Sequence, residues 1–70
     1  MNTRTNTGKV KFFNENKGFG FITDTTDPTK DYFFNYTKVI DKDIQKDDVV
    51  TFDVGHGKKG LQAINVKRVI

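Results

Sequence analysis

Apolar and polar residues alternate most clearly between positions 17 and 23, and this alternation predicts a β-strand. One face carries Lys17, Phe19, Phe21 and Thr23, and the opposite face carries Gly18, Gly20 and Ile22. The face that should fill a core thus contains two residues without side chains, whereas two phenyl rings share the other face with a cation. Inward glycines permit the coiling and close strand approach that a small barrel needs. The pattern fits two arrangements: an aromatic face displayed to solvent, or two phenylalanines buried in a core.

Four further segments alternate in the same way and predict strands at 8–14, 32–37, 49–54 and 61–69. Their expected inward positions are Val10, Tyr32, Phe34, Val50, Phe52, Val54, Ile64 and Val66, which leaves Lys9, Lys11, Phe33, Asn35, Thr51 and Asp53 outward. Strict alternation cannot place both Lys11 and Phe12 outside, so an outward Phe12 requires a β-bulge near the end of the first strand. The orientation of Tyr36 stays open, because the third strand turns at that point.

The links between these strands are short and polar. Turn-forming residues occupy 14–16, and residues 27–30 suit a type I turn with Asp first and Pro second. Residues 38–48 form an irregular connection anchored by Val39, Ile40 and Ile44, and residues 55–60 form a flexible basic loop. Five strands without a substantial helix predict an all-β fold, a five-stranded antiparallel OB-fold barrel or an SH3-like barrel. Residues 1–7 are expected to be a flexible N-terminal tail and residues 8–70 a single domain.

Composition favours the displayed aromatic face. A chain of 70 residues buries a small core, yet it contains seven phenylalanines and two tyrosines. Each aromatic side chain buries about 150–250 Å², so some of them are expected outside the core. The chain has no cysteine, which excludes disulfides and thiolate chemistry. No apolar run reaches the roughly 18 residues of a membrane span, so a soluble cytoplasmic protein without a membrane partner is expected.

The net charge of +3 is unevenly distributed. Residues 1–23 carry four cations and one acid, residues 24–54 carry four lysines and eight aspartates, and residues 55–70 carry four cations and no acid. If the first and last segments are neighbours in space, the molecule has a basic side that a polyanion would approach. A solvated surface of mixed charge is the alternative interpretation.

Four segments taken in order resemble the cold-shock domain family across residues 8–70. Residues 8–14 (Gly-Lys-Val-Lys-Phe-Phe-Asn) resemble its first strand, and residues 17–22 (Lys-Gly-Phe-Gly-Phe-Ile) match its first ribonucleoprotein motif. Residues 31–37 lie where the second motif belongs, and residues 60–66 resemble the last strand. The resemblance implies a five-stranded OB barrel that binds single-stranded RNA and DNA with little sequence preference. The binding residues that it implies are Lys11, Phe12, Lys17, Phe19, Phe21, Phe33, Asn35, Tyr36 and Lys59.

This chain departs from the family pattern at several of these positions. Phe12 stands where the family usually has Trp, and Asn35 replaces a histidine whose ring can stack. The segment 38–43 looks shorter than usual and lacks an aromatic residue that often contacts bases. Because each stacked base contributes about 1–3 kcal/mol, these changes are expected to weaken binding or shorten the bound strand. Tyr32 and Phe34 replace smaller valines, so the core must make room for them, for example beside Gly18 and Gly20.

The leading functional hypothesis is a passive nucleic-acid chaperone that acts as a monomer. Its rings would stack on unpaired bases and its lysines would neutralise phosphates, so binding only the melted strand would keep that strand unpaired. No cofactor, metal or small-molecule substrate is expected. Roles in transcription or translation under stress follow from the resemblance. No residue is an evident reader of the ribose 2′-hydroxyl, so RNA and DNA both remain candidate ligands.

Two other classes of function are weighed against this one. An enzyme is disfavoured because His56 is the sole histidine, lies between two glycines, and has no thiol or convergent carboxylate beside it in the sequence. The adjacent Asp47 and Asp48 suit a turn better than a catalytic pair. A barrel whose aromatic face binds a peptide is the remaining alternative, but a proline-rich ligand would not need the interleaved lysines.

Overall fold

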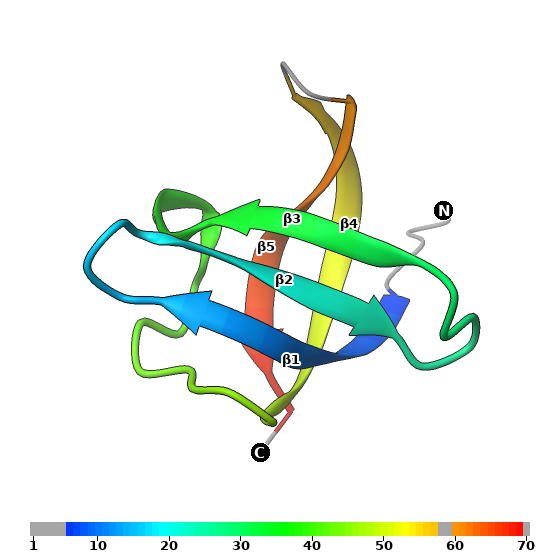
Figure 1. Ribbon diagram of the computed structural model, residues 1–70, viewed down its shortest axis with the longest axis horizontal. Helices are drawn as coiled ribbons and strands as arrows, with labels where there is room; N and C mark the ends of the chain where they lie inside the picture. The colour runs from blue at the N-terminus through cyan, green and yellow to red at the C-terminus, as the bar shows by residue number, and fades with distance from the viewer. Residues whose placement is uncertain (1–5, 58–59, 70) are drawn as a thin grey trace.

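The computed structural model describes residues 6–57 and 60–69. Within them, the strands β1 (Asn6–Asn14), β2 (Phe19–Asp24), β3 (Asp31–Asn35), β4 (Val49–Gly57) and β5 (Gly60–Arg68) form a closed barrel in the order β1-β2-β3-β5-β4 (Figure 1). A short 3₁₀ helix, η1 (Tyr36–Lys38), follows β3. Neighbouring strands are antiparallel except β3 and β5, which pair in parallel and close the barrel. This architecture confirms the OB-fold prediction.

The core is built from the inward positions of all five strands and from the connection between η1 and β4. Its buried residues are Val10, Ile22, Phe34, Val39, Ile44, Val50, Phe52, Ala63 and Val66. Tyr32 and Tyr36 are half-buried against this core. Burying a side chain such as Phe34, which is fully enclosed, contributes about 1.5–3 kcal/mol. The alternation read from the sequence is therefore correct for most inward positions.

Gly20 makes room for the large Phe34 side chain. A Cβ atom at position 20 would collide with the Phe12 carbonyl oxygen of β1 and would lie 2.7 Å from two atoms of the Phe34 ring. Such a contact is far closer than atoms in a packed core tolerate, so a larger residue would push this ring out of place. Gly18 has a different role, because its φ of +74° closes the turn before β2.

A bulge in β1 places adjacent side chains on the same outer surface. The pairing of β1 with β2 shifts between Val10 and Phe12, so the partner of Val10 is Ile22 and the partner of Phe12 is Phe21. Lys11 and Phe12 are consequently both exposed. The irregularity that an outward Phe12 requires is thus present in the structure.

Several predicted boundaries differ from the structure. β1 begins at Asn6, because residues 6–9 pair with β4, and so Asn6 and Thr7 are not part of a tail. β2 begins at Phe19, which leaves Lys17 in the preceding turn. β3 ends at Asn35, where the chain enters η1. The basic loop expected at 55–60 largely continues β4 and β5, which project beyond the barrel as a long hairpin (Figure 1).

Three apolar side chains expected in the core lie elsewhere. Val54 is 37% exposed, although it pairs with the buried Ala63 on β5. Ile64 is half-buried on the outer face, where it lies against Gly55, and Ala63 takes the inward position. The left-handed conformation of Asn65, with φ of 52°, interrupts the alternation between Ala63 and the inward Val66. Ile40 is 57% exposed, so Val39 and Ile44 are the apolar side chains of the connection that reach the core.

No helix within residues 6–57 and 60–69 has the length and apolar character needed to cross a membrane.

Candidate nucleic-acid interface

Four phenyl rings gather on the outer surface of β1, β2 and β3. We call Phe12, Phe19, Phe21 and Phe33 the ring cluster. Phe19 is the hub, with its ring centroid 5.8 Å from Phe33, 5.9 Å from Phe12 and 6.4 Å from Phe21. The Phe21 and Phe33 rings are 5.9 Å apart in an edge-to-face arrangement. Phe12 is 43% exposed and Phe21 36% exposed, while Phe19 and Phe33 are half-exposed.

Strand register explains why these rings meet. Phe12, Phe21 and Phe33 are consecutive cross-strand partners on β1, β2 and β3, and the row continues to Gln62 on β5. Phe19 lies two residues before Phe21 and therefore on the same face. Since offset and edge-to-face pairs stabilise one another, the rings are held in place before any ligand arrives. The alternative that Phe19 and Phe21 fill the core is wrong.

A groove of about 640 Å³ extends from this cluster to the projecting hairpin. Its floor contains Phe19, Phe21 and Phe33, and the β4–β5 hairpin supplies Leu61 and Gln62 on one side. Leu61 is 54% exposed and so presents an apolar side chain to any ligand. The remaining lining residues are Asp31, Asn35, Lys38, Gly57 and Gly60. The groove combines flat apolar surface with a small number of polar groups at its edges.

Lys11 forms an ion pair with Asp31, which lies on the same face of β3 as Phe33 of the ring cluster. Its Nζ donates to Asp31 Oδ2 over 2.8 Å, and Thr23 Oγ1 donates to Asp31 Oδ1 over 2.8 Å. These hydrogen bonds, from Lys11 first and Thr23 second, lower the pKa of the Asp31 carboxyl below its ordinary value. Because the pair is solvent-exposed, it contributes about 0–1 kcal/mol, and a phosphate could replace Asp31 at low cost.

Asn35 has a structural task as well as a place in the groove. Its Oδ1 accepts hydrogen bonds from Thr37 N at 3.0 Å and Thr37 Oγ1 at 2.9 Å, and so caps η1. The Nδ2 group has no partner among the described residues. Asn35 therefore retains its donors for a ligand, whereas its acceptor is already used.

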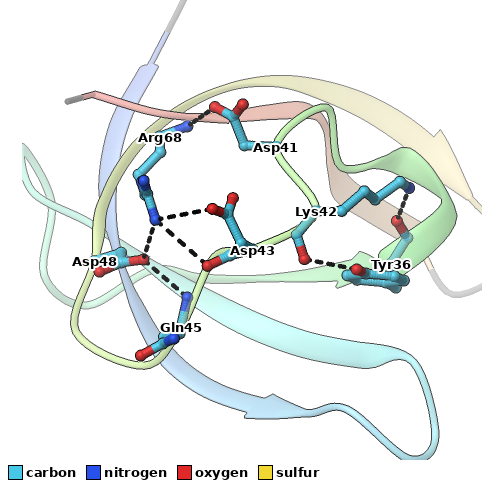
Figure 2. Close-up of polar contacts among 7 residues, drawn as sticks. All are labelled: Tyr36, Asp41, Lys42, Asp43, Gln45, Asp48 and Arg68. Carbon is cyan, nitrogen blue, oxygen red and sulfur yellow. Dashed lines mark hydrogen bonds and ion pairs between the residues drawn. The ribbon is translucent and has the colours of Figure 1, made fainter.

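Tyr36 does not belong to the ring cluster. Its ring packs on Phe13 with centroids 5.6 Å apart, and its hydroxyl donates to the Lys42 carbonyl oxygen over 2.6 Å (Figure 2). It does not line the groove, so the structure separates it from the other expected binding rings. Lys17 is exposed in the turn between β1 and β2, and Lys59 lies outside the described residues.

Asp31, Lys38, Leu61 and Gln62 line the groove but are not among the binding residues predicted from the sequence. Asp31 shares the strand face of Phe33, so alternation alone could have included it. Lys38 lies in η1, beyond the point where alternation ends. Leu61 and Gln62 enter the groove through the parallel pairing of β5 with β3, which no local pattern reveals.

Comparisons with known proteins agree with this geometry. Residues 6–69 match the family model described as the 'Cold-shock' DNA-binding domain. The chain is 45% identical over 65 residues to the cold shock-like protein CspA of Shewanella violacea, covering 89% of this chain and 91% of that protein. It is 40% identical over 65 residues to the cold shock-like protein CspC of Escherichia coli, covering 89% of this chain and 93% of that protein.

A solved structure shows the same fold. The chain superposes on the Drosophila Unr structure CSD456 with a TM-score of 0.79 and 30% identity, covering 96% of this chain and 27% of that longer chain. The sequence match, the closed barrel and the ring cluster on β1–β3 together lead to one conclusion. The chain belongs to the cold-shock domain family, a family of nucleic-acid-binding domains rather than of enzymes.

Proposed function

We propose that the protein binds single-stranded RNA or DNA in the groove and acts as a passive chaperone that keeps strands unpaired. The observation that carries this proposal is the ring cluster, which holds four phenyl rings in partial contact with water beside lysines. Base stacking on such rings contributes about 1–3 kcal/mol per base and tolerates any sequence, because every base has a flat face. The proposed binding residues are Lys11, Phe12, Lys17, Phe19, Phe21, Phe33, Asn35, Tyr36 and Lys59, of which Lys17, Tyr36 and Lys59 rest on family resemblance.

The groove favours an unpaired strand over a duplex. Stacking on the ring cluster requires bases whose faces are free, and in a duplex those faces are covered by neighbouring base pairs. A protein that binds only the open form of a hairpin shifts the equilibrium toward it. At a free concentration of 100 times the dissociation constant, the shift is about 2.7 kcal/mol. That is enough to open marginally stable hairpins without ATP.

We infer a monomer that works in the cytoplasm, with residues 8–70 as one domain. In the closed barrel each strand has a neighbouring strand on both sides along part of its length, which limits the open sheet edge available for pairing between copies. The proposed roles in transcription or translation rest on the family resemblance, and the proposed link to stress rests on relatives named cold shock-like proteins.

The experiment uses fluorescence anisotropy to measure binding of a short labelled pyrimidine strand. Phe19→Ala and Phe21→Ala are compared with Ile40→Ala, which removes an apolar side chain that is 57% exposed and does not line the groove. We expect the two groove variants to lose about 5- to 150-fold in affinity and the control to keep it. Undiminished binding by folded Phe19→Ala and Phe21→Ala would reject the stacking role.

The same titration tests the competing class of ligand. A labelled proline-rich peptide that binds more tightly than the oligonucleotide would identify the barrel as a peptide-interaction module. A duplex of the same sequence should bind more weakly than the single strand. Equal affinity for both would contradict the chaperone mechanism.

A further inference from the structure

Lys42 contacts both the backbone and the ring of Tyr36. Among the described residues, no other lysine makes this combination of contacts with an aromatic residue. Its Nζ donates to the Tyr36 carbonyl oxygen over 2.8 Å and lies 4.6 Å from the centroid of the Tyr36 ring. In return, the Tyr36 hydroxyl donates to the Lys42 carbonyl oxygen over 2.6 Å (Figure 2). The side chain of each residue therefore donates a hydrogen bond to the backbone of the other. The ammonium group also lies over the Tyr36 ring in a cation–π contact.

The segment that carries Lys42 is anchored on both sides of it. Arg68 N donates to Asp41 Oδ2 over 2.9 Å, and the Arg68 guanidinium reaches the Asp43 carbonyl at 3.4 Å and the Asp48 carboxylate at 3.9 Å (Figure 2). Val39 and Ile44 are buried in the core. These contacts hold the backbone on either side of Lys42, and the ammonium group is positioned by its own contacts with the Tyr36 carbonyl and ring.

The surroundings of the Tyr36 ring leave little room for a ligand. Phe13 is nearly parallel to it at a centroid distance of 5.6 Å, and Phe13 in turn stacks on the buried Phe34 at 5.9 Å. The phenol thus packs against Phe13 and the core on one side and is contacted by Lys42. A base could stack on Tyr36 only after the ammonium group has moved away.

We propose that Lys42 is a built-in competitor for the Tyr36 ring and thereby sets the length of the strand that this protein binds. This inference rests on the proposed function. With Lys42 in place, the base-stacking surface ends at the ring cluster. When Lys42 is absent or displaced, Tyr36 becomes available for one further nucleotide at the end of the strand.

Intrinsic fluorescence can test this arrangement, because the chain has two tyrosines and no tryptophan. Tyr32→Phe leaves Tyr36 as the only emitter. The Tyr32 ring packs against Phe52 in a tilted arrangement with centroids 5.4 Å apart, and its hydroxyl has no partner among the described residues, so phenylalanine should preserve the packing. Lys42→Ala is then compared with Lys46→Ala in this background. Lys46 is an exposed lysine of the same segment with no hydrogen bond or ion pair among the described residues, so both variants lose one positive charge.

The first measurement uses acrylamide and no nucleic acid. Lys42→Ala should raise the quenching constant of Tyr36 above that of both the parent and Lys46→Ala. Equal quenching constants in the two variants would overturn the inference, because Lys42 would then not cover the ring.

The second measurement uses pyrimidine strands of about four and about eight nucleotides. Relative to Lys46→Ala, Lys42→Ala should bind the longer strand about two- to five-fold more tightly, the factor expected when a base no longer displaces an exposed cation–π pair. The shorter strand should show no such difference, and only the longer one should quench Tyr36 further. A loss of affinity specific to Lys42→Ala would show that Lys42 binds phosphate instead, and would overturn the inference.

The two proposals fail in distinguishable ways. If no variant binds either strand but the acrylamide quenching constant of Lys42→Ala still exceeds that of Lys46→Ala, the proposed nucleic-acid binding is rejected and the coverage of the Tyr36 ring by Lys42 is supported. If strands bind and quench Tyr36 equally with and without Lys42, the inference falls and the proposed function stands.

Discussion

Phe33 and Phe34 are adjacent in β3 but face opposite sides of the barrel wall, so the same substitution should affect binding at one position and folding at the other. Phe33 packs between Phe19 and Phe21 on the outer surface and lines the groove. Phe34 is fully buried and stacks on Phe13. Leucine at either position keeps most of the apolar volume and removes the flat ring.

The magnitudes follow from these surroundings. Phe33→Leu removes a stacking partner for one base, so we expect affinity for a single strand to fall by about 5- to 150-fold, equivalent to about 1–3 kcal/mol. Its unfolding free energy should fall by roughly 1 kcal/mol or less, since the lost ring pairs are half-exposed. Phe34→Leu changes the shape of the core and should cost about 1–3 kcal/mol in stability. At about 0.05–0.15 kcal/mol of unfolding free energy per residue, a 70-residue domain is stable by about 3.5–10.5 kcal/mol, which exceeds this loss.

Urea denaturation measures the stability of both variants, and fluorescence anisotropy with a labelled strand measures affinity under conditions where both are folded. Phe34→Leu should retain nearly the affinity of the parent. The reasoning is refuted if Phe33→Leu binds as tightly as the parent, or if Phe33→Leu destabilises the protein as much as Phe34→Leu does.

Three further predictions concern packing, pH and salt. Gly20→Ala should lower the unfolding free energy by about 1–3 kcal/mol, since its Cβ would overlap the Phe12 carbonyl oxygen and the Phe34 ring; a urea midpoint equal to that of the parent would contradict this packing. Asp24 accepts hydrogen bonds from the Thr26 hydroxyl at 2.7 Å and the Thr26 amide at 2.8 Å, which lower its pKa from 3.8. Its contribution to stability is therefore fully present above about pH 3.8 and is lost as the pH falls through the lower folded-state pKa. Asp24→Asn should therefore reduce the loss of unfolding free energy at acid pH. An unchanged acid-induced loss would count against this role of Asp24. Finally, the logarithm of the binding constant should fall linearly with the logarithm of salt concentration, by about 0.7 for each phosphate neutralised on a single strand, and a flat response would exclude phosphate contacts.

The sequence by itself determined the strands and most of their faces. A side chain's face depends on local parity, because successive residues of a strand point to opposite sides. Val10, Ile22, Val50 and Phe52 could therefore be predicted inward and Phe33 outward. Parity also put Phe19 and Phe21 together on the face opposite Ile22, and composition favoured that face as the outward one. The need for a bulge beside Phe12 also followed from parity, because Lys11 and Phe12 could not otherwise share a face.

The tertiary structure decided whatever depends on residues distant in the chain. The parallel pairing of β3 with β5 brings Leu61 and Gln62 to the groove, and the left-handed Asn65 moves Ile64 out of the core. Val54 is exposed although alternation predicts it inward, and Tyr36 faces Lys42 because Arg68 fixes the connecting segment. Parity is a property of neighbouring peptide units, whereas barrel closure, strand register and loop anchoring arise only when separate segments pack together.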